Sequence, residues 1–168
     1  MQRENVLSAG NQQGRSGSGL TSGYVSGFVD GEGSFHIAIY KDPRMKTGIK
    51  MIPEFHVSQR VTSRSVLDRL VDFFGCGYVK ANHATNSNDR TYVYVVRNRE
   101  ALLTRIIPFF RKNLLQTEKA NDFATFAKIV EAMAEGSHRN ESGVRGILEL
   151  AYQMNGGGRY RRQDLRKI

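Results

Sequence analysis

Three glycines spaced four residues apart constrain this chain more than any other feature. Gly23, Gly27 and Gly31 would line one face of an α-helix and leave a stripe without side chains, across which another helix backbone can approach closely. Each glycine weakens a helix by about 1 kcal/mol relative to alanine, so three of them require a compensating contact. Two carboxylates, Asp30 and Glu32, stand at the end of this stretch. The sequence therefore predicts a closely packed helix that ends at an acidic pair.

The charge balance points to an acidic partner. Among 168 residues, 25 are Lys or Arg and 16 are Asp or Glu, which gives a formal net charge of +9 and a pI near 9.9. A polyanion such as nucleic acid is the natural partner of so basic a chain. The length suits one domain with a core of its own.

Cysteine and histidine usage argues against two kinds of site. The only cysteine, Cys76, permits no internal disulfide and no cysteine cluster for zinc, which fits a reducing intracellular setting. The four histidines are too scattered along the chain to predict a zinc site. His36 and His56 are expected on an exposed strand face, and His83 and His138 elsewhere on the surface.

The two ends differ in composition from the middle. Residues 1–19 predict a flexible leader, and residues 156–168 predict a basic tail that either touches phosphate or is solvated and disordered. No apolar run reaches the roughly 20 residues that span a bilayer, and no signal-peptide pattern is present. We therefore expect no membrane partner, an intracellular location where the target nucleic acid lies, and a folded domain over residues 20–155.

Periodicity predicts a helix, two strands, a second helix, two more strands and then further helices. Apolar residues at every second position predict strands over residues 35–42 and 50–58, with Phe35 and Phe55 on their apolar faces. The second helix is expected to begin at Thr62 or Ser63 and to end at Gly75. The other expected elements are strands at 77–82 and 91–97, and helices at 98–107 (stopped near Pro108), 117–135 and 141–154.

This αββαββα order, together with the glycine helix, resembles the LAGLIDADG homing endonucleases. The matching motif runs over residues 26–33 and is preceded by Gly23. Further similar stretches lie at residues 55–59, 74–79, 108–110, 119–123, 141–144 and 154–155. The resemblance covers about residues 20–155 and implies an α+β fold, in which helices cover one face of a saddle-shaped antiparallel sheet.

The resemblance also implies how the chain assembles. Family members with one glycine helix per chain form homodimers, and this sequence contains that helix once. The two helices of such a dimer would meet at a two-fold axis lined by Gly23, Gly27, Phe28 and Gly31.

The same resemblance places the chemistry at the end of the glycine helix. Glu32 matches the family's metal-ligating acid, with the Gly31 carbonyl as a further ligand, and two copies would hold Mg²⁺, or Mn²⁺ in its place. Gln59 matches the residue that positions solvent near the metal. Lys119 matches the residue that polarises the attacking water or steadies the phosphate. The implied reaction is metal-dependent hydrolysis of DNA phosphodiesters, as a double-strand break with short 3′ overhangs.

Two details of this site stay open in the sequence. A shift of the alignment by one helical turn would put Gln116 where Lys119 is expected. Asp30 is the weaker candidate for a metal ligand, because an acid at the earlier motif position more often serves the helix end or a subunit contact. Glu118 departs from the family, in which many relatives carry a second basic residue.

DNA would be read by the exposed strand face, in the major groove of a pseudo-palindrome of roughly 20 bp. Its candidates mix donors, acceptors and cations, as base recognition requires: His36, Tyr40, Asp42, Lys50, Glu54, His56, Lys80, Asn82, Arg90 and Thr91.

Two other functions remain open in the sequence. A maturase that binds intron RNA would use the same scaffold with an added basic surface, and the Arg-rich tail could supply it. A non-catalytic DNA-binding regulator ranks lower, because such a protein has typically lost the acid that is present here as Glu32. The sequence gives neither the target site nor the host gene, and it leaves open whether the setting is organellar, bacterial or archaeal.

Overall fold

A four-stranded antiparallel sheet organises the chain in the computed structural model, which describes residues 17–83 and 88–157. The strands are β1 (Gly33–Lys41), β2 (Ile49–Arg60), β3 (Tyr78–Ala81) and β4 (Thr91–Val96), in the spatial order β1-β2-β4-β3. Most of the expected leader (residues 1–16) and tail (residues 158–168) lies outside the described residues. Residues 17–19 are held against the domain, since Arg69 Nε donates to the Ser18 carbonyl at 2.9 Å.

The strand register assigns each side chain to one of two faces. Phe35 pairs with Phe55 between β1 and β2, and Phe55 pairs with Val96 between β2 and β4. These residues are buried beneath helices on the covered face, which also carries Tyr94. His36 and His56 have the opposite parity and lie on what we call the open face. The predicted alternation in the first two strands is confirmed.

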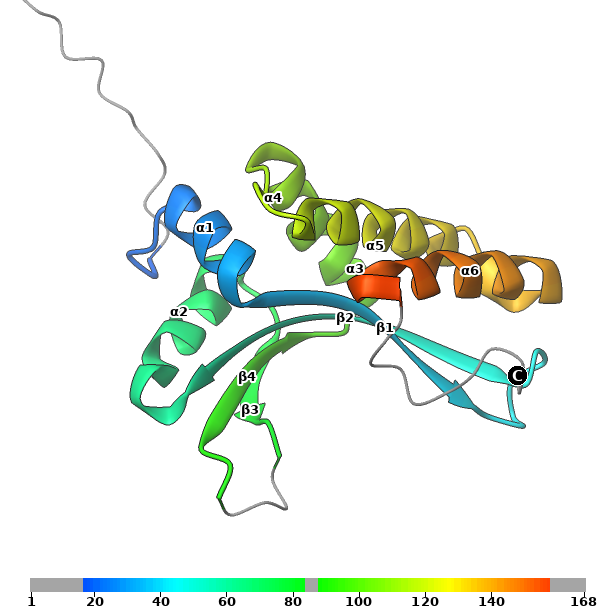
Figure 1. Ribbon diagram of the computed structural model, residues 1–168, viewed down its shortest axis with the longest axis horizontal. Helices are drawn as coiled ribbons and strands as arrows, with labels where there is room; N and C mark the ends of the chain where they lie inside the picture. Colours follow the sequence, from blue (N-terminus) through cyan, green and yellow to red (C-terminus); the bar gives the residue numbers. More distant parts are fainter. Residues whose placement is uncertain (1–16, 84–87, 158–168) are drawn as a thin grey trace, which may run out of the picture.

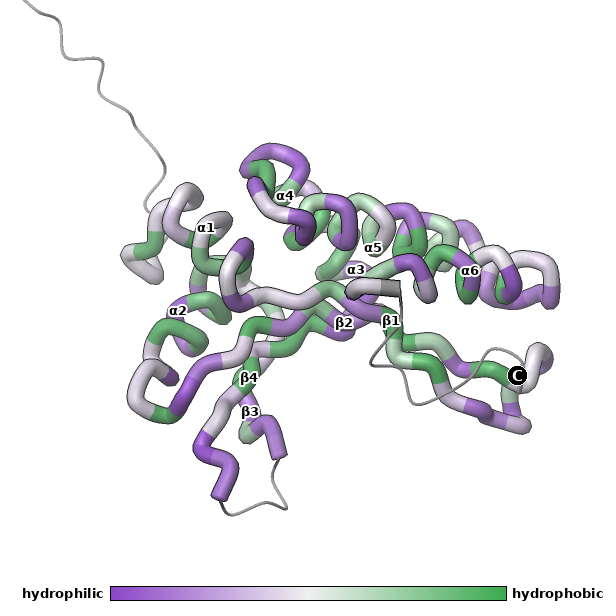
Figure 2. The backbone as a smooth tube through the Cα atoms, viewed as in Figure 1, coloured by the Kyte–Doolittle hydropathy of each residue, from purple (hydrophilic) through white to green (hydrophobic). Residues whose placement is uncertain are grey.

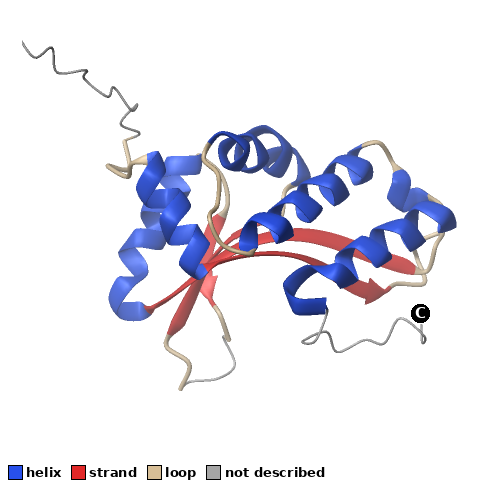
Figure 3. Cartoon of the chain, turned by 45° about the horizontal axis from the view of Figure 1, so that its top comes forward, coloured by secondary structure: helices blue, strands red, loops and turns tan. Residues whose placement is uncertain are grey.

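The helices gather on one side of the sheet. They are α1 (Ser22–Glu32), α2 (Arg64–Phe74), α3 (Arg99–Ala101), α4 (Ile107–Lys112), α5 (Lys119–Ala134) and α6 (Glu141–Gly157). Figures 1 and 3 show α4, α5 and α6 above the sheet, with α1 and α2 at the end of the molecule away from the tip of the β1–β2 hairpin. No helix of the described residues covers the open face, and the ends of both hairpins are hydrophilic (Figure 2).

Local signals explain where α1 and α2 begin and end. The Thr21 hydroxyl accepts a hydrogen bond from the Tyr24 N–H at 3.2 Å and so caps α1. Gly75 ends α2 in the left-handed conformation at φ 61°, as predicted. Ser63 occupies the N-cap position of α2, but its side chain makes no capping hydrogen bond.

The expected stop near Pro108 is wrong. The chain stays helical from Arg99 to Lys112 because a π-helical turn, η2 (Leu102–Ile106), precedes the proline. Pro108 then stands at the start of α4, where its missing N–H costs little because the regular hydrogen-bond ladder is already interrupted.

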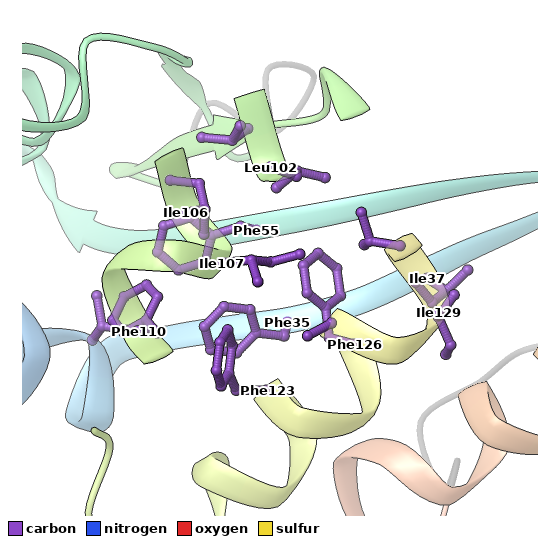
Figure 4. Packing of buried hydrophobic residues seen from close by; sticks show 14 of the residues in the cluster. Phe35, Ile37, Phe55, Leu102, Ile106, Ile107, Phe110, Phe123, Phe126 and Ile129 are labelled. Atoms are coloured by element: carbon purple, nitrogen blue, oxygen red, sulfur yellow. The ribbon is translucent and has the colours of Figure 1, made fainter. Parts of the chain in front are cut away.

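Phenylalanines from the sheet and the helices build the core. Phe35 is fully buried, and its ring contacts Phe55, Phe110, Phe123 and Phe126 at centroid distances of 5.0 to 5.5 Å. Figure 4 shows these rings meeting between β1, β2, α4 and α5. Because this cluster joins the strands to two helices, it fixes the sheet relative to the layer that covers it. No helix of the described residues is long and apolar enough to cross a membrane.

Replacing Phe35 with alanine should lower the free energy of unfolding by about 3–5 kcal/mol, because it empties the centre of this aromatic cluster. The matched control is Tyr40→Ala. Tyr40 is 48% exposed, so the loss of its side chain should change stability by less than about 0.5 kcal/mol. Urea unfolding followed by circular dichroism measures both. A loss below about 1 kcal/mol for Phe35→Ala would contradict the assigned core.

Candidate functional site

The end of α1 meets the start of β1 in a turn that only glycine fits. A Cβ at position 33 would lie 2.6 Å from Val29 Cγ1 and 2.7 Å from the Val29 carbonyl oxygen. Gly33 therefore lets β1 follow α1 without a linker. As a result, the last helical residue, Glu32, is exposed at the junction between helix and sheet.

Asp30 fastens a distant loop to this junction. Its carboxylate accepts hydrogen bonds from the Gln116 N–H at 2.8 Å, the Thr117 N–H at 3.2 Å and the Thr117 hydroxyl at 2.7 Å. Burial raises the pKa of Asp30, but these hydrogen bonds and Lys119 outweigh it and hold the pKa below its ordinary value. Since its oxygens are committed to the loop, Asp30 has a structural role here.

Lys119 brings a cation to the same junction. Its ammonium donates to the Val29 carbonyl at 3.1 Å and to the Gly31 carbonyl at 3.4 Å. Burial lowers the pKa of Lys119, against the opposing effect of Asp30, Glu32 and Asp122. The Gln116 side chain instead donates to the Leu114 carbonyl. The structure thus brings Lys119, and not the side chain of Gln116, to the end of α1.

Gln59 lies near the end of β2 and is half-buried. Gly33 pairs with Val57, so Gln59 lies two residues further along β2, at the level of the α1 terminus. Strand alternation places it on the covered face, the face on which α1 packs. The register therefore brings Gln59 towards the junction that already holds Glu32 and Lys119.

The glycine stripe faces away from the rest of the chain. Gly23, Gly27 and Gly31 are all exposed, and a Cβ built on any of them meets no atom within 4 Å. The opposite side of α1 buries Val25 and Val29 completely. No close contact within the described residues therefore requires glycine at the three stripe positions.

Two aromatic rings flank the stripe. Tyr24 is 49% exposed and stacks on the half-buried Phe28 with ring centroids 5.7 Å apart. An apolar edge beside a surface without side chains is suited to pack against another helix.

The donors at the junction fit a hard divalent cation. Within the described part of the chain, the exposed Glu32 carboxylate has no hydrogen bond or ion pair, and the preceding residue, Gly31, contributes a carbonyl at the end of α1. Carboxylate and carbonyl oxygens are the ligands that Mg²⁺ and Ca²⁺ prefer. The Gly31 carbonyl accepts from Lys119 yet keeps a second lone pair. One chain offers few such oxygens, so a second Glu32 would complete the set.

Most predicted DNA-facing residues are accessible on the open face or the hairpin ends. Tyr40, Lys50, Lys80, Asn82 and Arg90 are exposed, and His36, His56 and Thr91 are half-buried. Asp42 and Glu54 are buried, contrary to the expectation that every candidate is exposed. Tyr78 and Arg97, which the sequence pattern did not predict for this face, also reach it, because Tyr78 pairs with Val95 and Arg97 approaches Glu54.

Asp42 is buried because it organises the β1–β2 turn. Its carboxylate accepts two hydrogen bonds from the Arg44 guanidinium, at 2.8 and 2.9 Å, and one from the Arg44 N–H. Arg44 lowers the pKa of Asp42 to about 2. An aspartate engaged in this way is not free to accept from a base.

Glu54 is buried beneath three basic side chains. Its Oε2 lies 2.9 Å from His36 Nε2 and 3.0 Å from His56 Nε2, and Arg97 Nε approaches Oε1. Burial raises the pKa of Glu54, but the two histidines outweigh it and hold the pKa well below its ordinary value. The expectation that the histidines are too scattered to share a site is wrong for His36 and His56, which the β1–β2 register brings together.

Comparison with known proteins places this arrangement in a family. A sequence profile described as "LAGLIDADG endonuclease" matches residues 25–130. A "Probable intron-encoded endonuclease 2" of Neurospora crassa is 34% identical over 141 residues, which are 83% of this chain and 30% of that protein. The chain thus spans less than a third of the length of this curated relative.

Solved structures share the fold. The homing endonuclease I-TnaI superposes with a TM-score of 0.77 at 39% identity, over 84% of this chain and 92% of that one. I-SmaMI, solved bound to an uncleaved DNA target in the presence of calcium ions, superposes with a TM-score of 0.76 at 34% identity, over 82% of this chain and 46% of that one.

The two acids at the junction should differ in their effect on stability. Asp30→Ala should lower the free energy of unfolding by about 1 kcal/mol or more, because it removes three hydrogen bonds to residues 116 and 117. Glu32→Ala should change it by less than about 0.5 kcal/mol. Equal losses in urea unfolding would contradict the separate roles assigned to the two carboxylates.

Proposed function

The chain belongs to the LAGLIDADG endonuclease family, and from this premise we propose that it is a site-specific homing endonuclease that works as a homodimer. Two copies joined through α1 would make a double-strand break in a long pseudo-palindromic DNA site. The observation that carries the proposal is the exposed glycine stripe of α1, which ends at an exposed carboxylate, Glu32.

The stripe supports assembly because each of its glycines weakens α1 without serving the single chain. Close approach of a second α1 would offset that cost and would bury the exposed edge formed by Tyr24 and Phe28. A two-fold axis along this stripe brings the two α1 termini together, since the same surface is used by both copies. The superposition covers 92% of the I-TnaI chain, so that homing endonuclease chain is about as large as the subunit that we propose here.

The junction residues then take distinct parts in hydrolysis. The paired Glu32 carboxylates and the Gly31 carbonyls would hold Mg²⁺, with Mn²⁺ able to replace it, and the bound ion would supply Lewis acidity beside the scissile phosphate. Lys119, anchored on the carbonyls of Val29 and Gly31, would steady the negative phosphate. Gln59 would orient solvent from the end of β2. Asp30 would keep the loop that precedes Lys119 in place.

The open face supports DNA as the partner. It carries no helix of the described residues and presents cations at both hairpins, including Lys50, Lys80 and Arg90. A formal net charge of +9 favours a polyanion. The superposable I-SmaMI was solved bound to DNA. Recognition by strands in the major groove is the geometry that such a face allows.

The alternative partner, intron RNA, was predicted from the basic tail. Residues 158–168 lie outside the described residues, so a maturase role stays a prediction. Gel-shift titration with intron RNA and with target DNA, followed by a cleavage assay, separates the two activities. Tight RNA binding without DNA cutting would favour the maturase.

Gly27→Leu should convert the dimer into a monomer and abolish cutting, because a leucine side chain fills the space that the second helix needs. Analytical ultracentrifugation measures the assembly, and a library of plasmid targets measures cleavage. The matched control is Gly146→Leu on α6, where a Cβ also meets nothing within 4 Å. A monomeric Gly27→Leu protein that still cuts both strands would overturn the proposed interface.

Glu32→Gln should retain specific DNA binding and lose cleavage in Mg²⁺, because the amide keeps the shape of the side chain but lacks the charge that a hard cation requires. Removal of the divalent cation by EDTA should likewise abolish cleavage by the unaltered protein. Glu135→Gln, an exposed acid at the far end of α5, is the matched control and should cut normally. Cleavage by the Glu32→Gln protein at the unaltered rate would exclude Glu32 as a metal ligand.

A further inference from the structure

A second group of potential metal ligands lies on the open face, away from the α1 terminus. His36 of β1 pairs directly with Glu54 of β2, and His56 follows two residues along β2 on the same face. One ligand atom from each of the three lies within 4.8 Å of the other two. Because the cross-strand register fixes these positions, the two sheet strands themselves hold the group together.

The spacing of these atoms is close to that around a zinc ion. His36 Nε2 and His56 Nε2 lie 2.9 and 3.0 Å from the same oxygen, Glu54 Oε2. Ligands bonded to zinc at about 2.0–2.2 Å in a tetrahedron lie roughly 3.3 Å apart, so small side-chain rotations would admit an ion. The two imidazoles stand edge to face, with centroids 4.5 Å apart and planes at 77°.

Two atoms of this group, His56 Nε2 and Glu54 Oε1, are inaccessible to solvent. Each has an oppositely charged neighbour, Glu54 Oε2 and Arg97 Nε respectively, but neither contact has acceptable hydrogen-bond geometry among the described residues. Buried polar atoms in such a state are costly unless another ligand satisfies them. A cation coordinated by His56 Nε2 would satisfy the nitrogen directly.

Arg97 lies beside the group and sets a limit on where an ion can sit. Its Nε approaches Glu54 Oε1, so the other oxygen, Oε2, is the one turned to both histidines. In metal sites a ligating carboxylate is typically fixed by an outer-shell group that donates to its other oxygen, and Arg97 occupies that place here. The side chains of His36 and His56 are 29% and 22% exposed, which leaves an entry path from the open face.

We propose that His36, Glu54 and His56 bind one Zn²⁺, or a similar borderline divalent cation, on the open face. Two imidazoles and one carboxylate form a zinc-type ligand set that leaves a fourth position for water or another ligand. Mg²⁺ prefers oxygen ligands and would not compete effectively. The bound ion would add two positive charges to the face that we propose for DNA, independently of the cleavage site.

Zinc titration of the full chain in excess Mg²⁺ tests this site, with isothermal calorimetry giving the stoichiometry. We expect one Zn²⁺ per chain, and His36→Gln or His56→Gln should each weaken binding at least about tenfold. His83→Gln and His138→Gln are the matched controls and should bind as the unaltered chain does. Titration with Co²⁺ adds a visible absorption band that reports ligation by the ring nitrogens.

Circular dichroism melting of each variant separates loss of the site from loss of the fold. Absence of zinc uptake by the unaltered chain would overturn the proposal. So would equal uptake by a folded protein that carries both His36→Gln and His56→Gln, because the ion would then lie elsewhere.

Discussion

Close approach of two helices along a surface without side chains is the constraint that gives the glycine stripe of α1 its purpose and brings two copies of Glu32 together in the proposed dimer. The glycines of α1 serve nothing within the described chain: all three are exposed, and each would accept a Cβ without a clash. Gly33 and Gly77 behave differently, because a Cβ there would meet Val29 or Tyr94 at 2.6 Å. The contrast separates glycines needed by the fold of one chain from glycines that leave room for a second.

The junction at the end of α1 shows how the fold positions chemistry. Gly33 joins helix to strand without a linker, Asp30 holds residues 116 and 117, and that loop leads directly into α5 with Lys119 at its start. Lys119 then returns to the carbonyls of α1. Three segments far apart in the sequence are thereby fixed around Glu32. The aromatic cluster around Phe35 holds the sheet in position against the helices that carry these segments.

Sequence reasoning predicted the parts of this arrangement that depend on local pattern. Alternation placed Phe35 and Phe55 inward, and the motif placed an acid at the end of the glycine helix. It failed where neighbours in space decide the outcome. Pro108 did not stop the helix, because a π-helical turn accommodates it. Asp42 and Glu54 share the parity of exposed residues, yet Arg44 and the His36–His56 pair bury them. The sequence did not predict the histidine pair, because the pair depends on the register between β1 and β2, which the pattern of a single strand does not specify.

A covalent link across the proposed two-fold axis tests assembly through the glycine stripe most directly. In a Cys76→Ser background, Gly27→Cys should form a disulfide-linked dimer under mild oxidation, because cysteines near a close-packed two-fold axis can meet the 4.4–6.8 Å Cα separation that a disulfide requires. The linked dimer should still cut DNA in Mg²⁺. Absence of the link would contradict assembly through the glycine stripe. So would a control protein with Asp72→Cys, on the exposed side of α2, that forms a linked dimer as readily as the Gly27→Cys protein.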